Sequence, residues 1–125
     1  MRRRTARHFA DVRLAVEEMA RVSGDRVLLV DTTFMGDDAE EAETLRDPSH
    51  VRNYSETEWR LFLEEAALDV VDVRRLDHAF DFAAWLARTG CEGEEAALVE
   101  ALLGGRVADG RLTLDKVALR ATKRS

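Results

Sequence analysis

The sequence predicts an α/β fold. The segment 27–30 (VLLV) is short, aliphatic and not interrupted by polar residues, as is typical of a strand buried on both faces of a parallel sheet. Residues 11–23 before it and residues 56–66 after it repeat apolar side chains at the spacing of an amphipathic helix. A strand, a crossover helix and a second strand form a right-handed unit with parallel strands. The length of 125 residues corresponds to a single domain.

The first half of the chain contains three predicted elements. The helix over residues 11–23 has Asp11 as a suitable N-cap. The strand over residues 26–31 follows, and polar residues end it. The acidic segment 37–47 is mildly helical, and Pro48 closes it.

The clearest helix prediction is the one over residues 56–66, because Ser55 and Glu58 match a capping box at its start. A second strand is predicted from Val70 to Leu76. Apolar residues of the helical segments, above all the aromatic ones, are expected in the core: Trp59, Phe62, Phe82 and Trp85.

The last third of the chain predicts two helices and a strand. Asp81 caps a short helix that ends at Gly90, and residues 96–103 form another helix. The strand over residues 112–123 changes its apolar phase midway, which predicts a bulge or a break near residues 115–116.

The composition excludes several classes of protein. The chain has 25 acidic and 19 basic residues and a net charge of −6, whereas nucleic-acid-binding domains are usually basic. No apolar run approaches the roughly 20 residues of a membrane span. A single cysteine, Cys91, excludes an internal disulfide framework and indicates a reducing compartment. We therefore expect a cytoplasmic protein that binds neither nucleic acid nor membrane.

Four arginines lie within residues 2–7, and no apolar segment of a signal peptide follows them. We expect a solvated terminus, or a tail that pairs with the acidic residues 37–43. Those acidic residues lack the glycine and the alternation of a calcium loop and are predicted to form a solvated helical face. The three histidines have no zinc-like spacing, so we expect no metal site.

In open parallel sheets, ligands bind beyond the carboxyl ends of the strands. Here that edge would hold Asp31 and the loop that runs to Tyr54. Asp31 is suited either to a ligand site or to capping the next turn. His50 is suited to hydrogen-bonding a ligand or to acting as a base, or it ties down the backbone of its loop.

Several segments in the same order carry a resemblance to a known family. They are residues 6–12 (ARHFADV), 16–22 (VEEMARV), 26–31 (RVLLVD), 45–52 (LRDPSHVR), 59–68 and 81–86 (DFAAWL). They resemble the C-terminal half of class I S-adenosylmethionine-dependent methyltransferases, in the small-molecule branch related to the ubiquinone and menaquinone methylases. The sequence departs from that pattern at Arg7, where a second histidine is common, and at Ala67, where a glycine cap is common.

The resemblance implies that residues 1–125 form one domain with part of a Rossmann-like sheet. The strands near 26–31 and 69–76 would be parallel, with the C-terminal strand antiparallel between them, and helices 11–23 and 56–66 would share one face. On the substrate side the resemblance places His8, Phe9, Asp31 and the segment 47–54, and it identifies no catalytic residue.

The family cofactor is S-adenosylmethionine, which a glycine-rich turn after the first strand and an acidic residue after the second hold in place. This sequence contains neither, so we expect no cofactor binding and no activity from the chain alone. The methyl acceptor would be a small molecule. The alternative is a non-catalytic binding or assembly module.

The same comparison implies that the strand over residues 26–31 is an unprotected edge. Such an edge is a template for pairing with another chain. We therefore expect a homodimer, or a complex with a complementary methyltransferase half, joined near residues 26–31.

Overall fold

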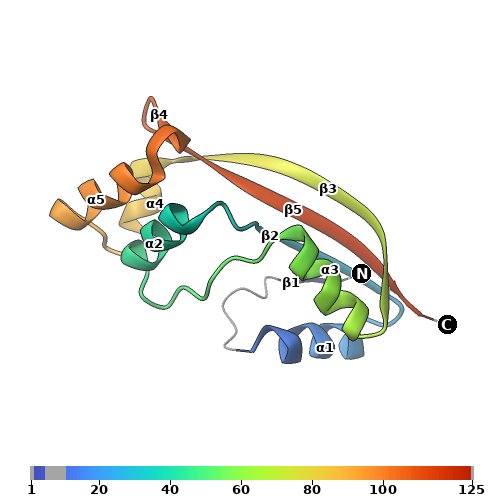
Figure 1. Cartoon of the computed structure of the whole chain (residues 1–125). Coiled ribbons are helices and arrows are strands. Elements are labelled where there is room, and N and C mark those ends of the chain that lie inside the picture. Colours follow the sequence, from blue (N-terminus) through green and yellow to red (C-terminus); the bar gives the residue numbers. More distant parts are fainter. Residues whose placement is uncertain (1, 5–10, 125) are drawn as a thin grey trace.

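The computed structural model describes residues 2–4 and 11–124 (Figure 1). In this part of the chain the predicted helices and strands occur in the predicted order, and two short strands, Arg2–Arg4 and Val107–Ala108, are additional. Their bounds in chain order are β1 (Arg2–Arg4), α1 (Val12–Val22), β2 (Arg26–Thr32), α2 (Asp37–Arg46), α3 (Glu56–Glu65), β3 (Leu68–Asp81), α4 (Phe82–Ala87), α5 (Gly93–Leu103), a 3-10 turn (Gly104–Arg106), β4 (Val107–Ala108) and β5 (Arg111–Lys123).

The strands form one mixed sheet in the order β1-β2-β5-β3, with β4 paired to β5. β1 and β2 are parallel, and β5 is antiparallel to both β2 and β3. The strands β2 and β3 are therefore parallel to one another, with the C-terminal strand between them. This arrangement confirms the α/β fold and the strand directions expected from the sequence.

The first hydrophobic core lies between one face of the sheet and the helices α1 and α3, which sit on the same side (Figure 1). Asp11 caps α1 by accepting hydrogen bonds from two backbone N–H groups. Ser55 and Glu58 form the predicted capping box of α3. These caps direct the apolar stripes of both helices onto the strands, and the core includes Val16, Leu29, Trp59, Phe62, Leu63 and Leu119.

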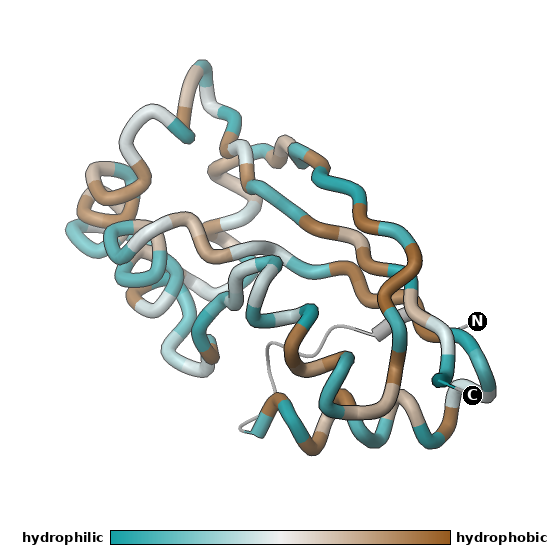
Figure 2. Tube along the Cα trace, turned by 45° about the vertical axis from the view of Figure 1, so that its right-hand side comes forward, coloured by the Kyte–Doolittle hydropathy of each residue, from teal (hydrophilic) through white to brown (hydrophobic). Residues whose placement is uncertain are grey.

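A second hydrophobic core lies at the far end of the long β3–β5 pair, where α2, α4 and α5 pack together. We call these three helices the distal unit. Figure 2 shows that the distal unit and the α1–α3 pair occupy opposite ends of the long strands. Phe82 and Trp85 are buried in this core, as predicted, together with Leu112 and Leu114 of β5.

The predicted bulge near residues 115–116 is wrong. β5 keeps an unbroken register with β3 from Arg111 to Arg120, and the shift in register lies in β3, between Val70 and Asp72. The apolar phase of β5 changes because the strand serves both cores. Successive side chains point to opposite faces, so Leu114 faces the distal unit whereas Val117 faces α1 and α3.

The prediction that residues 26–31 form a bare edge is also wrong. β1 pairs with β2 from Arg2 opposite Val27 to Arg4 opposite Leu29. Strand pairing uses backbone N–H and C=O groups, so three successive arginines can extend a sheet although their sequence shows no strand pattern. The backbone of Arg2–Arg4 is therefore part of the sheet. Arg7 lies outside the described residues.

Candidate functional site

Asp31 lies near the carboxyl end of β2 and is buried, with 2% of its surface exposed. Its Oδ1 accepts a hydrogen bond from the backbone N–H of Thr32 at 2.8 Å. One carboxylate oxygen thus satisfies the backbone at the strand end, which agrees with the capping role that the sequence left open. Across the sheet Asp31 is paired with Val117 of β5.

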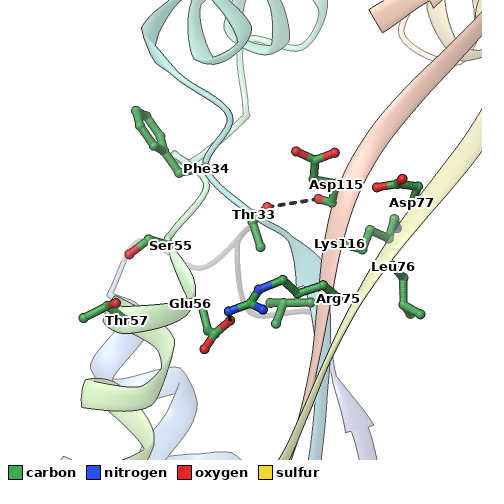
Figure 3. A pocket seen from close by; sticks show the side chains of 11 residues that line it. Thr33, Phe34, Ser55, Glu56, Thr57, Arg75, Leu76, Asp77, Asp115 and Lys116 are labelled. Atoms are coloured by element: carbon green, nitrogen blue, oxygen red, sulfur yellow. Dashed lines mark hydrogen bonds and ion pairs between the residues drawn. The ribbon is translucent and has the colours of Figure 1, made fainter.

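A cavity of about 520 Å³ opens just beyond the end of β2 (Figure 3). Three parts of the chain build it: the segment after β2, the first turn of α3 and the middle of the β3–β5 pair. The lining residues are Thr33, Phe34, Ser55, Glu56, Thr57, Arg75, Leu76, Asp77, Asp115, Lys116 and Val117.

Charged groups dominate the strand wall of this cavity. Asp77 and Asp115 are direct partners across β3 and β5, an arrangement that like charges disfavour. Arg106 offsets part of this repulsion, because both of its terminal nitrogens lie 3.2 Å from the Asp115 carboxylate. Carboxylates that line a cavity can accept hydrogen bonds from a polar ligand, so this wall is a candidate ligand site.

The opposite wall is formed by the N-terminus of α3. Glu56 lies 2.7 Å from the Nη2 of Arg75, so this ion pair spans the cavity from α3 to β3 (Figure 3). Phe34 contributes a partly exposed ring. A pocket of this size with one aromatic surface and several charged groups suits a small polar molecule.

His50 does not line this cavity. Its side chain is 3% exposed, and its Nε2 lies 3.5 Å from Glu40 Oε2 and 3.8 Å from Glu43 Oε2. Asn53 completes the cluster, because its backbone N–H donates to Glu40 Oε1 at 2.6 Å and its side-chain amide donates to Glu43. The geometry favours the role in which His50 ties its loop down, here against α2.

This cluster also corrects the expectation of a solvated acidic face on α2. Glu43 is 2% exposed and Glu40 is partly buried, whereas Asp37, Asp38 and Glu41 are exposed. Glu40, Glu43 and His50 offer possible ligand atoms within 4.8 Å of one another. The hydrogen bonds within the cluster already account for its geometry, and the expected absence of a metal site stays a prediction.

Tyr54 is a core residue that fastens one rim of the cavity. Its ring makes edge-to-face contacts with Trp59 and Phe62, with centroids 5.2 Å apart in each case. Its carbonyl accepts a hydrogen bond from the N–H of Phe34 at 3.1 Å. The sequence placed Tyr54 at the end of the loop beyond β2, and the structure shows that its side chain packs in the core and does not line the cavity.

The remaining candidates, His8 and Phe9, lie outside the described residues. The sequence analysis missed the charged cavity wall formed by Arg75, Asp77 and Asp115. A usable signal was present, because polar residues interrupt both β3 and β5 at positions that pair with one another.

The sequence of the chain is similar to two curated proteins. No family model matches the chain. It is 36% identical over 95 residues to the uncharacterized methyltransferase YcgJ of Bacillus subtilis, covering 70% of this chain and 38% of YcgJ. It is 34% identical over 93 residues to the uncharacterized protein YafE of Escherichia coli, covering 69% of this chain and 45% of YafE. The chain thus spans less than half the length of these relatives.

Two solved structures match almost the whole chain. The crystal structure of BH2331 from Bacillus halodurans, a protein designated a methyltransferase, matches with a TM-score of 0.81 and 24% identity over 98% of this chain and 62% of that one. The crystal structure of YcgJ matches with a TM-score of 0.81 and 27% identity over 98% of this chain and 64% of that one.

The fold of this chain is therefore that of a methyltransferase domain. Its sequence relatives include one protein that is named a methyltransferase, YcgJ of Bacillus subtilis. Among the described residues, no helix is long and apolar enough to cross a membrane.

Proposed function

We propose that these residues form the acceptor-binding part of an S-adenosylmethionine-dependent methyltransferase that acts on a small molecule. As in the sequence resemblance, we place it in the branch of the ubiquinone and menaquinone methylases. The observation that carries the proposal is a charged cavity at the carboxyl end of β2 in a sheet that matches solved methyltransferases over 98% of the chain.

We expect that this chain does not by itself provide a cradle for the cofactor, because its sequence contains no glycine-rich turn of the kind that the family resemblance implies. S-adenosylmethionine supplies an electrophilic methyl group when bound. We infer that a further polypeptide segment, on the same chain or another, holds it.

The contribution of this chain would then be to bind and orient the acceptor. Methyl transfer depends chiefly on alignment of the nucleophile with the methyl group, and rigid elements position such sites best. The cavity is built by β3, β5 and the capped start of α3, and the Glu56–Arg75 ion pair joins two of its walls. Arg75 and Asp77 are the groups that we expect to contact a polar acceptor.

Calorimetric titration with S-adenosylmethionine tests this division of labour. The purified 125-residue chain should show no micromolar binding. The chain co-expressed with the part of YcgJ that it does not match should bind the cofactor. Micromolar binding by the chain alone contradicts our placing of the cofactor, and no binding by the assembled pair contradicts the methyltransferase function.

A methyl-transfer assay on the assembled pair tests the acceptor cavity, with radiolabelled cofactor and a short-chain hydroquinone as the probe. Asp77→Ala should reduce transfer at least tenfold, because Asp77 lines the cavity. Asp38→Ala, an exposed carboxylate of α2, is the matched control and should leave the rate unchanged. Equal rates for the two variants would place the acceptor elsewhere.

The alternative, a non-catalytic binding or assembly module, predicts a complex that never binds the cofactor, so the titration separates the two functions. We propose a cytoplasmic setting, because the single cysteine indicates a reducing compartment. As β1 already pairs with β2, we favour a complementary methyltransferase segment over a homodimer joined through that strand.

A further inference from the structure

The strand wall of the cavity beyond β2 contains a carboxylate without a partner in the described part of the chain. Asp77 of β3 lies directly opposite Asp115 of β5 in the sheet. Among the described residues, no hydrogen bond or ion pair involves the side chain of Asp77. Figure 3 shows the carboxylates of Asp77 and Asp115 next to one another on this wall. The charge of Asp77 is therefore available to a ligand in the cavity.

The other charged side chains on this face of the sheet are paired. Arg106 donates to both carboxylate oxygens of Asp115, each at 3.2 Å. Arg75 forms an ion pair with Glu56, with Nη2 and Oε1 2.7 Å apart. Each of these pairs combines one positive and one negative charge, so neither of them offsets Asp77.

Lys116 also borders the cavity, but its side chain belongs to the opposite face of the sheet. Successive residues of a strand alternate between the two faces. Asp115 therefore shares the face of Val117, which packs in the core under α1 and α3, whereas Lys116 does not. The Nζ of Lys116 lies 5.6 Å from the centroid of the Phe80 ring, and Phe80 packs against the second core.

The N-terminus of α3 carries a partial positive charge that could attract an anion. Here its own acidic residues oppose that charge. Ser55 Oγ accepts a hydrogen bond from the N–H of Glu58, and Glu58 Oε1 accepts one from the N–H of Ser55. Glu56 adds a second carboxylate in the same turn. The charge that remains in the cavity is therefore negative.

We propose that the acceptor bound in this cavity carries a positively charged amine, which Asp77 and Asp115 hold. An ammonium group donates charge-assisted hydrogen bonds to carboxylates, and between these two it offsets their mutual repulsion. An anionic acceptor would meet the charge of Asp77 without a counter-charge, so the cavity selects against it. Phe34 is 40% exposed and offers a ring surface to an aromatic or cationic group. The inference rests on the proposed function and adds the class of acceptor.

The test measures ligand binding to the 125-residue chain in the absence of cofactor, by NMR titration. The probes are tyramine, 4-ethylphenol and 3-(4-hydroxyphenyl)propionate, which share a phenol ring and carry a positive charge, no charge and a negative charge. Tyramine should bind at least tenfold more tightly than either of the other two. The neutral probe shows how much of the binding is due to the ring alone.

Asp77→Asn removes the charge but keeps the size of the side chain and a hydrogen-bond acceptor. It should abolish the preference for tyramine and change the affinity for 4-ethylphenol less than twofold. Asp38→Asn is the matched control, because Asp38 is an exposed carboxylate of α2, and it should keep the preference. Urea unfolding midpoints establish that both variants are folded.

Three results would overturn the inference: no binding of tyramine, equal affinities for the three probes, or equal loss of tyramine binding in the two variants. Titration of the assembled pair with S-adenosylmethionine keeps this inference separate from the proposed function. A pair that binds tyramine through Asp77 but binds no cofactor contradicts the proposed function and leaves the amine site standing. A pair that binds the cofactor without a preference for tyramine does the reverse.

Discussion

Arg46 contacts both the ring and the backbone carbonyl of Trp85. The guanidinium carbon lies 4.1 Å from the centroid of the Trp85 ring. Its Nε and Nη2 donate hydrogen bonds to the Trp85 carbonyl oxygen at 3.1 and 3.0 Å. Arg46 ends α2 and Trp85 lies in α4. The contact therefore joins two helices that follow different strands, β2 and β3.

Replacing this arginine should loosen the distal unit. We expect Arg46→Met to lower the free energy of unfolding by about 2 kcal/mol, because it removes a cation–π contact and two hydrogen bonds but keeps most of the apolar stem. Urea unfolding followed by tryptophan fluorescence measures the change. Arg88→Met, at the exposed end of α4, is the control. Equal midpoints for the two variants would show that the Arg46–Trp85 contact adds nothing.

Ala67 has a φ of 63°, a backbone conformation that favours glycine. It follows the last turn of α3, and its carbonyl accepts the N–H of Arg124 at 2.9 Å. We expect Ala67→Gly to stabilise the protein by about 1 kcal/mol, because a left-handed conformation costs a residue with a Cβ about that much. Ala66→Gly, at a φ of −86°, should destabilise it. The midpoints of thermal and urea unfolding measure both changes in stability. A loss of stability in both variants would contradict the strain at Ala67.

Two of the three glutamates of α2, Glu43 and Glu41, allow a matched test of the loop cluster. Glu43 is buried and accepts a hydrogen bond from the Asn53 side chain, whereas Glu41 is exposed. Glu43→Ala should cost about 2 kcal/mol, because it leaves a buried amide without its acceptor. Glu41→Ala should cost less than about 0.5 kcal/mol. Similar costs for both variants, measured by urea unfolding, would mean that the cluster does not secure the loop.

Cys91 should react slowly. Burial and the nearby Glu95 carboxylate raise the pKa of its thiol above the ordinary range, and Arg46 opposes them only in part. The thiolate is the reactive form, so a raised pKa leaves less of it at pH 8. We expect labelling by a disulfide reagent at pH 8 to be at least tenfold slower in the native chain than in urea. Glu95→Gln should speed native labelling, whereas Glu94→Gln should not, and equal native and unfolded rates would contradict the burial of Cys91.

The sequence was a good guide wherever a helix cap and an apolar stripe coincide. Asp11, Ser55 and Asp81 each precede a helical repeat, and all three cap helices in the structure. Strands whose side chains are polar gave no such signal. β3 continues to Asp81 rather than to Leu76, because backbone pairing with β5 continues regardless of side-chain type.

The sequence predicted the edge of the sheet where the candidate site lies, but not the role of each residue there. The edge beyond Asp31 was predicted because strand direction alone defines it. The roles of His50 and Tyr54 depend on contacts with α2 and α3, which no local pattern reports. One missed signal was local. Asp109 and Gly110 both have positive φ and form the turn that pairs β4 with β5, and Asp-Gly is a strong hairpin signature.

The position of β5 has a consequence for the order in which the chain can fold. It follows every other strand in the sequence, yet both β2 and β3 pair with it. During synthesis those two strands have no common partner until β5 leaves the ribosome, although α1 and α3 are complete much earlier. The pairing of Val27 with Ala121 joins residues that are 121 − 27 = 94 positions apart, and such distant pairings are slow to form. Until then the strands stay open to misassociation. Refolding should therefore show helix formation first and closure of the sheet as its slowest step.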